Sequence, residues 1–481
     1  MLLNSIFIMP VFGMICICFI PSTNELLIKR VALVTSFFTF YLSLFLWLFF
    51  DNSGGFFQYV FEFNWLTFLN INFIVGIDGI SLFFVLLTAF LFPLCVLLGW
   101  KNISFRVKEF FILFLFLEVL LLLIFAILDL FLFYILFESI LIPMFLIIGI
   151  WGSRERKIRA AYFFFIYTLF SSLIMLVGIL IILFEVGTTN YFILASHTFS
   201  FERQLLLWLM FFSSFSFKIP IVPFHSWLPE AHAESPTLGS VILAGLLLKL
   251  GTYGLLRFSF VLFPQANTYF TPLVYTIAVI SILYSSLTTI RQIDLKKIIA
   301  YSSVAHMNFT LLGLFSHNIQ GIEGGLVLMI SHGFVASALF ICIGILYDRH
   351  HTRLLKYYSG LTLVMPIFSI LFLFFSLSNL GLPGTSSFIG ELLILVGSFS
   401  LTKIPTILGS LGILLGSVYS IWLYNRVCFG NLKIQYNSVY IDVSLREFCV
   451  LGPLVLMTLI LGLYPSVFLD CLYTSSLGFI V

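Results

Sequence analysis

Long apolar runs recur along the whole chain and set the strongest limit on its fold. A helix needs roughly 20 apolar residues to cross a hydrocarbon layer of about 30 Å, and about fourteen such segments lie between charged or Gly/Pro-rich breaks. Because backbone polar groups inside lipid must be paired within the protein, we expect an all-α membrane protein. The approximate segments are 5–20, 31–50, 79–99, 109–127, 130–150, 160–184, 204–222, 238–260, 270–290, 297–316, 320–346, 361–400, 404–427 and 448–470.

Composition disfavours the other broad classes of protein. The chain is 61% apolar and 9% charged, whereas a soluble domain carries about a quarter charged residues. Nucleic-acid binders and aqueous enzymes therefore fit poorly. The seven cysteines form no C-x-x-C pair, and no glycine-rich phosphate loop follows a strand, so neither a metal cluster nor a bound nucleotide is indicated. The 60 phenylalanines favour an A+T-rich genome such as that of an organelle.

The lysines and arginines test the helix count, because they concentrate in loops on one side of a membrane. Eighteen of the 23 fall in alternate loops. Arg203, Arg257 and Lys403 fall on the other side, and Lys218 and Lys249 lie inside spans. We therefore expect both termini on the outer face and the basic loops on the matrix or cytoplasmic face.

Two of the expected helices are interrupted at their centres. The seventh contains Pro220 and Pro223, and the twelfth contains the G-L-P-G sequence at 381–384. Because the two are displaced by five helices, an odd number that inverts the orientation, helices four to eight and nine to thirteen could be two inverted-topology repeats, which are typical of ion-translocating folds. The alternative is that the prolines serve packing alone. The repeat interpretation gives four regions: 1–108 with helices one to three, 109–260 as the first repeat, 261–428 as the second, and 429–481 with helix fourteen.

Ionisable residues inside the spans are functional candidates, because a charge at the bilayer centre costs about 2.5 to 3.5 kcal/mol. They are Glu118, Glu138, Lys218, Lys249, His306, His332 and Glu391. A mixed series of acids, bases and histidines suits proton transfer, since such groups shift one another's protonation.

Glu138 and Lys218 each lie close to a proline that frees a backbone carbonyl. Pro143 cannot donate to the carbonyl of Ser139, and Pro220 leaves another carbonyl unpaired. The two side chains could form a pair whose separation changes with protonation, or a static buried ion pair.

The remaining candidates carry similar alternatives. Lys249 lies too deep to reach the surface easily and is predicted to be a second relay residue. His306 and His332 are relay histidines or hydrogen-bonded core residues. Glu391 is the last carboxylate able to pass a proton outward, whereas Glu118 could equally join two helices.

A polar stretch at 225–237 follows the seventh segment. Its spacing of His225 and His232 does not match an H-E-x-x-H helix, and prolines interrupt it, which disfavours a metal site. We expect a structured loop with Trp227 at the membrane interface.

Several motifs together resemble one family. They are F-K-I-P at 217–220, H-S-W-L-P-E-A-H at 225–232, S-P at 235–236 and G-S-V-I-L-A-G at 239–245 with Lys249. Supporting stretches are F-E-S at 137–139, L-K-K-I-I-A-Y-S-S-V-A-H-M at 295–307, G-L-P-G at 381–384 and F-I-G-E at 388–391. This set resembles the antiporter-like chain 4 family of NADH–ubiquinone oxidoreductase, respiratory complex I, over most of residues 110–400.

The resemblance implies a proton-pumping membrane-arm subunit with fourteen helices and two inverted five-helix units. Glu138 then matches the family's essential carboxylate, Lys218 its lysine partner, Lys249 the central lysine and Glu391 the exit carboxylate. His225, His306 and His332 match the relay histidines.

The resemblance also implies where the chain works and with what. Family members bind no redox cofactor, so flavin, iron–sulfur clusters and quinone are expected in partner subunits. Expected partners are the other membrane-arm subunits, especially antiporter-like chains 2 and 5, with membrane lipids and protons but no nucleic acid. The expected location is the mitochondrial inner membrane rather than a bacterial plasma membrane.

Two other functions compete with a redox-driven proton pump. One is a subunit of a multi-subunit cation/proton antiporter, and the other is a structural scaffold. The chain 4 motifs and the phenylalanine content disfavour the first, and the buried charges disfavour the second.

Overall fold

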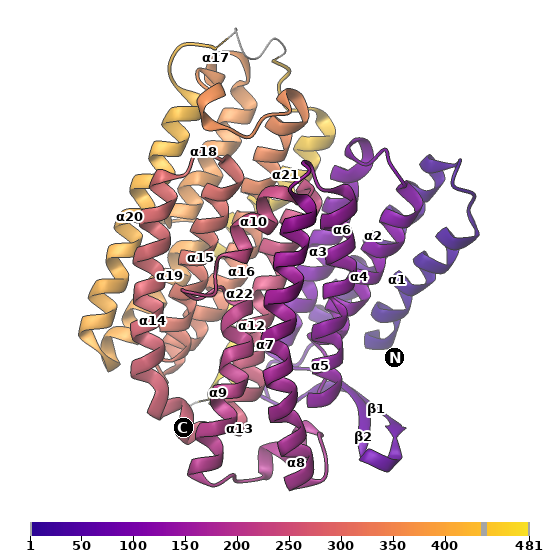
Figure 1. The fold of residues 1–481 in the computed structure, drawn as a ribbon, viewed down its shortest axis with the longest axis vertical. Helices are drawn as coiled ribbons and strands as arrows, with labels where there is room; N and C mark the ends of the chain where they lie inside the picture. Colours follow the sequence, from indigo (N-terminus) through magenta and orange to yellow (C-terminus); the bar gives the residue numbers. More distant parts are fainter. Residues whose placement is uncertain (1, 434–439, 480–481) are drawn as a thin grey trace. The chain divides into compact units, whose positions relative to one another are not determined.

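Helices dominate the computed structural model, which describes residues 2–433 and 440–479 (Figure 1). Ten helical stretches in these residues are long and apolar enough to cross a membrane, and Pro366–Leu380 and Ser386–Leu401 are shorter apolar helices. The prediction of a helical membrane protein is therefore confirmed, whereas the count of fourteen spans and the four predicted regions stay predictions. The chain divides into two compact units, described separately below.

Unit 1 comprises residues 1–218, 249–271 and 470–481. Its helices are α1 (Leu2–Phe19), α2 (Glu25–Leu48), α3 (Gly79–Asn102), α4 (Val107–Ile124), α5 (Leu130–Ser139), α6 (Leu141–Trp151), α7 (Lys157–Val186), α8 (Tyr191–Ser196), α9 (Phe201–Lys218), most of α12 (Leu248–Gly254), the π-helical η3 (Leu255–Ser259), α13 (Phe260–Leu262), and the ends of α14 and α22 with the 3₁₀ turn η5 (Leu477–Phe479).

The charged residue Glu118 joins two helices of this unit. It is fully buried on α4 and accepts a hydrogen bond of 2.7 Å from the Thr39 hydroxyl on α2.

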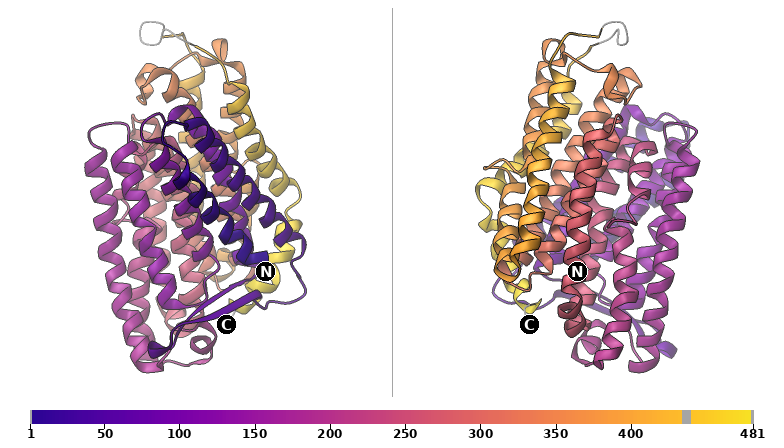
Figure 2. Two further views of the ribbon diagram at one scale, coloured as in Figure 1. Left: turned by 90° about the vertical axis from the view of Figure 1, so that its right-hand side faces the viewer. Right: turned by 60° about the vertical axis from the view of Figure 1, so that its left-hand side comes forward.

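A β-hairpin in unit 1 was not expected from the sequence. Strands β1 (Gln58–Leu66) and β2 (Ile71–Ile77) pair antiparallel around the 3₁₀ turn η1 (Thr67–Leu69). The backbone of β2 also bonds the α4–α5 connection, where Leu128 N donates to Ile74 O at 2.8 Å. The hairpin consequently lies across the ends of the unit 1 helices (Figure 2). Its strands are too short and too mixed in polarity to stand out among the long apolar runs.

A buried ion pair fixes the start of α3 in unit 1. Asp78 caps α3 and accepts from Ser81 N, while the Arg257 guanidinium of η3 bonds both Asp78 oxygens at 2.8 and 2.7 Å. Burial alone would raise the pKa of Asp78, but the guanidinium and the Ser81 hydrogen bonds together hold that pKa below its usual value. The placement of Arg257 in an outer loop is therefore wrong, because its side chain is 2% exposed inside a helix.

Unit 2 comprises residues 219–248 and 272–469. Its helices are α10 (Trp227–Glu234), α11 (Thr237–Ile242), the π-helical η2 (Leu243–Leu247), most of α14 (Pro264–Arg291), α15 (Leu295–Leu314), α16 (Ile319–His350), the 3₁₀ turn η4 (Leu355–Tyr357), α17 (Leu361–Val364), α18 (Pro366–Leu380), α19 (Ser386–Leu401), α20 (Lys403–Cys428), α21 (Leu445–Leu463) and the first part of α22 (Ser466–Ser476). The predicted interruption at 381–384 separates α18 from α19.

Helices α16 and α19 approach each other closely through glycines. A Cβ added at Gly324 would come within 2.7 Å of the Ile394 backbone nitrogen, and one at Gly390 would come within 2.8 Å of the Leu328 backbone. Side chains there would force the two backbones apart. The small residues therefore set the spacing of the helices that carry His332 and Glu391.

We expect Asp78→Asn to destabilise unit 1, because it leaves the buried Arg257 guanidinium without a carboxylate. Breaking such a buried pair costs about 3–5 kcal/mol. The matched control is Glu185→Gln, since Glu185 pairs with the half-exposed Arg203 at 3.8 Å and exposed pairs contribute about 0–1 kcal/mol. Retention of the chain in its purified membrane assembly after graded heating measures both effects.

Linkage adds a pH signature to this prediction. The pKa of Asp78 is lower in the folded protein than in the unfolded chain. Its contribution to the free energy of unfolding is therefore fully present above the pKa of the unfolded state, and it is lost as pH falls through the pKa of the folded state. Asp78→Asn should remove this acid sensitivity. Equal heat and acid sensitivity of the two variants would contradict a structural role for the pair.

Candidate functional site

Glu138 and Lys218 lie near each other in unit 1. Lys218 ends α9 and is 2% exposed, and its ammonium lies 4.4 Å from the ring centre of Phe137. Glu138 is half-buried on α5 and interacts electrostatically with Lys218. Within the residues that the structure describes, no ion pair of 4.0 Å or less joins the two. The acid and the base therefore interact electrostatically without a direct ion-pair contact.

Lys249 is fully buried in α12, between two π-helical segments. These segments, η2 and η3, interrupt the otherwise continuous helix from Thr237 to Leu262. Single π-turns are rare and frequently mark functional sites, because they displace backbone groups from the regular pattern. Neither segment was evident from the spacing of the apolar residues.

Three of the predicted residues meet in unit 2. His306 Nδ1 on α15 lies 3.6 Å from Glu391 Oε1 on α19. The rings of His306 and His332, which lies on α16, have centroids 5.9 Å apart. His332 is 4% and Glu391 6% exposed. Two imidazoles and a carboxyl group are thus gathered from three different helices.

A small cavity adjoins His306 and Glu391. Its volume is about 20 Å³, and its polar lining consists of those two side chains with Asn379 and Tyr419. A cavity of this size can hold about one water when it has two to four polar partners. Asn379 lies in the last turn of α18, near the Gly381 interruption, and Tyr419 comes from α20. No signal in the sequence indicated that these two residues lie beside Glu391.

His225 lies in the connection between α9 and α10, with its ring 5.3 Å from that of Tyr284 and 6.0 Å from that of Tyr301. The expectation of a loop with Trp227 at the membrane interface is wrong. Trp227 begins α10 and is 1% exposed, because this short helix packs its apolar residues against the rest of unit 2.

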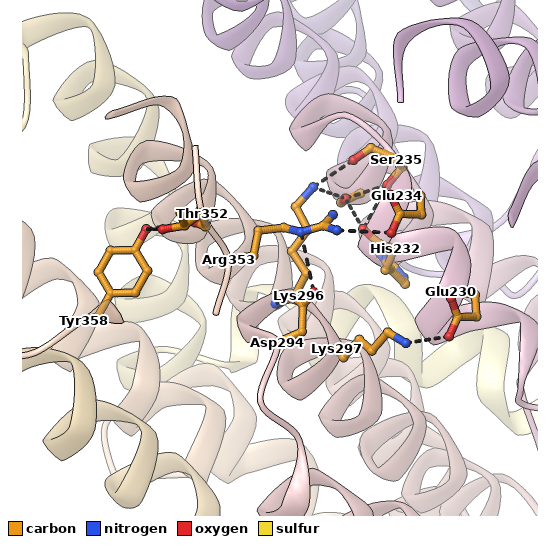
Figure 3. A network of polar contacts seen from close by, with 11 residues as sticks. Glu230, His232, Glu234, Ser235, Asp294, Lys296, Lys297, Thr352, Arg353 and Tyr358 are labelled. Carbon is orange, nitrogen blue, oxygen red and sulfur yellow. Dashed lines mark hydrogen bonds and ion pairs between the residues drawn. The ribbon is translucent and has the colours of Figure 1, made fainter. Parts of the chain in front are cut away.

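Helix α10 takes part in a buried polar network that the sequence did not reveal (Figure 3). Arg353 Nη2 bonds Glu234 Oε1 at 3.1 Å, and Arg353 Nε lies 3.5 Å from Asp294 Oδ2. The His232 ring stacks on Phe340 with centroids 4.6 Å apart. The network therefore ties α10 to the start of α15 and to the chain that follows α16.

Two lysines extend this network. Lys297 Nζ bonds Glu230 Oε1 at 2.5 Å, and Lys296 Nζ donates to the Ser235 carbonyl at 2.8 Å. In the described parts of the chain, no group of three or more His, Cys, Asp or Glu residues has a geometry suited to a metal ion.

Comparison with known proteins identifies the family. The model of the NADH:quinone oxidoreductase/Mrp antiporter transmembrane family matches residues 127–416. NADH-ubiquinone oxidoreductase chain 4 of Marchantia polymorpha is 57% identical over 98% of this chain and 96% of its own length. The chain belongs to the NADH-ubiquinone oxidoreductase chain 4 family. Chain 4 proteins of Arabidopsis thaliana and Mycosarcoma maydis are 56% and 48% identical, over 98% and 95% of this chain and 96% and 94% of their own lengths.

Solved structures agree with this assignment. A chain of respiratory complex I from Thermus thermophilus with bound NADH superposes with a TM-score of 0.90, at 29% identity and over 100% of both chains. A chain of the archaeal membrane-bound sulfane sulfur reductase has a TM-score of 0.88 over 99% of this chain and 97% of its own, but at 18% identity it shows only a common fold. The predicted resemblance to chain 4 is confirmed and extends to the first hundred residues and the tail.

We expect Gly381→Ala to displace the Glu391 carboxylate. Gly381 has φ +80°, and a Cβ there would collide with Glu391 Oε2. The matched control is Gly384→Ala, because Gly384 has φ +92° with nothing within 4 Å of an added Cβ. Both variants carry backbone strain of about 1–2 kcal/mol, but only the first should also lower NADH-driven proton uptake into vesicles. Equal proton uptake by both variants would show that the Glu391 carboxylate can move aside without loss of function.

Proposed function

We propose that this chain 4 family member is a proton-translocating subunit in the membrane arm of NADH:ubiquinone oxidoreductase. NADH oxidation and quinone reduction elsewhere in the complex supply the energy. The observation that carries this proposal is the contact of Glu391 with His306, close to His332 and beside a water-sized cavity, within a helical membrane chain. A scaffold has no need for exchangeable groups in such a place, whereas a proton path requires them.

In unit 1, Glu138 and Lys218 form an acid–base pair whose coupling changes with protonation. Their electrostatic interaction without a contact below 4.0 Å supports this role, since a tight ion pair would hold both charges fixed. Lys249 passes the proton onward from its buried position between the two π-helical segments.

In unit 2, His225, His306 and His332 relay the proton and Glu391 releases it. The contact of His306 with Glu391 supports the last transfer, because a nitrogen–oxygen separation of 3.6 Å closes to a hydrogen bond with a small side-chain rotation. Asn379 and Tyr419 orient the water in the adjoining cavity.

The redox groups belong to other subunits in this proposal. Flavin, iron–sulfur clusters and quinone are held by partners, and the antiporter-like chains 2 and 5 are the neighbours in the arm. The location is the mitochondrial inner membrane, which agrees with chain 4 relatives from plants and a fungus and with 60 phenylalanines in the sequence. The cation/proton antiporter alternative is less well supported, because the family model covers both kinds of protein but the full-length relatives are chain 4 proteins.

Glu391 tests whether the site moves protons or only makes hydrogen bonds. Glu391→Gln keeps the size but cannot titrate, whereas Glu391→Asp still titrates and is one methylene shorter. We expect Asp to retain much of the proton uptake and Gln to lose it by about 10²-fold or more, the range typical of a positioned acid or base. NADH-driven uptake into vesicles, normalised to assembled complex, gives the ranking, and the reverse order would indicate a structural hydrogen bond.

Lys218→Arg keeps a positive charge but prevents release of the proton, because guanidinium stays charged at any physiological pH. We expect it to reduce proton uptake per NADH strongly while the complex still assembles. Lys403→Arg is the matched control, since Lys403 is exposed at the start of α20. Full activity of Lys218→Arg would exclude proton exchange at this position.

A further inference from the structure

Two adjacent lysines at the start of α15 have opposite surroundings. Lys297 is 27% exposed and pairs with Glu230. Lys296 is 2% exposed, and its side chain runs into the network described above (Figure 3). The sequence gives no reason to separate them, but the structure makes one a surface ion pair and the other a buried amine.

The Lys296 ammonium group has neutral partners only. Its Nζ donates to the Ser235 carbonyl at 2.8 Å and lies 3.5 Å from Ser240 Oγ. Among the described residues, no carboxylate oxygen lies within 4.0 Å of this nitrogen. Of the three carboxylates that act on Lys296 electrostatically, Glu234 and Asp294 are held by Arg353, and the third is Asp348.

This arrangement raises the free energy of the charged form of Lys296. Burying an ammonium without an opposite charge in direct contact disfavours its charged form, and the neighbouring Arg353 guanidinium adds repulsion. The neutral amine has neither cost. The charged groups that act on Lys296 from the surrounding elements are Arg353, Asp294, Asp348 and Glu234, and His232 lies on the same helix as Glu234.

The same contacts serve both protonation states. The ammonium donates to the Ser235 carbonyl and, more weakly, to Ser240 Oγ. A neutral amine still donates to the carbonyl, while its lone pair accepts from the Ser240 hydroxyl. The Ser240 hydroxyl has other hydrogen-bond partners, since it lies 2.7 Å from Ser235 Oγ and 3.2 Å from the His232 carbonyl. Its hydrogen can therefore turn from one partner to another. A site that satisfies both states can bind and release a proton without unfolding its surroundings.

We propose that Lys296 is a further proton-exchanging residue of this chain, and that Arg353, held by Glu234 and Asp294, is the fixed charge that tunes it. This inference rests on the proposed function. The step is a proton transfer alone: hydronium and amine give water and ammonium, and the reverse reaction returns the proton to water. Because Lys296 lies in the first turn of α15, it serves the side of the membrane on which that helix begins.

Matched substitutions of the two lysines test the proposal in the assembled complex. Lys296→Arg keeps a charge and a donor for the Ser235 carbonyl but cannot release a proton. We expect it to lower proton uptake per NADH by about tenfold or more, as for loss of a positioned acid or base. Lys297→Arg should remain within about twofold, because a half-exposed pair contributes little and arginine retains it. Normal uptake by Lys296→Arg would overturn the proposal.

A milder variant covers the case in which Lys296→Arg does not assemble. Ser240→Ala removes the hydroxyl oxygen to which the Lys296 ammonium donates. Because a hydrogen bond from a charged donor is stronger than one to the neutral amine, Lys296 should lose its proton at a lower pH. We expect the alkaline limb of the proton-uptake profile to shift to lower pH relative to wild type and to Lys297→Arg. A purely structural lysine predicts an unchanged profile, which would reject the proposal.

Glu391→Gln measured in parallel separates this inference from the proposed function. If Glu391→Gln pumps normally, the proposed proton path through unit 2 is wrong. If Glu391→Gln loses pumping while Lys296→Arg and Ser240→Ala behave as wild type, only the role of Lys296 fails.

Discussion

A backbone amide in a hydrocarbon layer must find its hydrogen-bond partner inside the protein, and the structure follows from this constraint. Long helices satisfy it almost everywhere. In the part of the chain that the structure describes, the exceptions include the connection after Lys218, the two π-helical segments beside Lys249 and the interruption from Gly381 to Thr385. Each of these lies next to an ionisable side chain. Irregular backbone and buried charge therefore occur together, because each supplies polar groups that the other needs.

The two units hold buried charge in different ways. In unit 1, Asp78 and Arg257 are joined by two short bonds and are fixed in one arrangement. In unit 2, Arg353 has two carboxylates and the nearby Lys296 has none. An ion pair in which each charge has its partner stabilises a fold. Where one cation binds both carboxylates, the second cation is left without a close opposite charge, and its protonation can change. The same distinction separates Asp78 from Glu391, whose histidine neighbour is itself titratable.

The sequence predicted those features that have local causes. Apolar runs gave the helices, and the glycines and proline at 381–384 gave the interruption, where Gly381 and Gly384 have φ of +80° and +92°. Contacts between distant segments had no such signal. Arg257 meets a partner 179 residues away, and hydropathy does not distinguish an arginine turned inward from one in a loop. Tyr419 and Asn379 likewise look like ordinary helix residues until folding brings them to Glu391.

The glycine contacts between α16 and α19 have a mechanical consequence. Backbones this close cannot slide past each other without steric overlap, so α16 and α19 form one rigid pair of helices. His332 lies on α16 and Glu391 on α19, whereas His306 lies on a third helix, α15. Sliding therefore cannot alter the spacing of His332 and Glu391, which leaves side-chain rotation to change it. Helix α15 is held in the same way, because a Cβ added at Gly313 would come within 2.7 Å of the Gly321 carbonyl oxygen of α16. The gap between His306 and Glu391 is therefore also left to side-chain rotation, so that proton transfer there needs no movement of the helices.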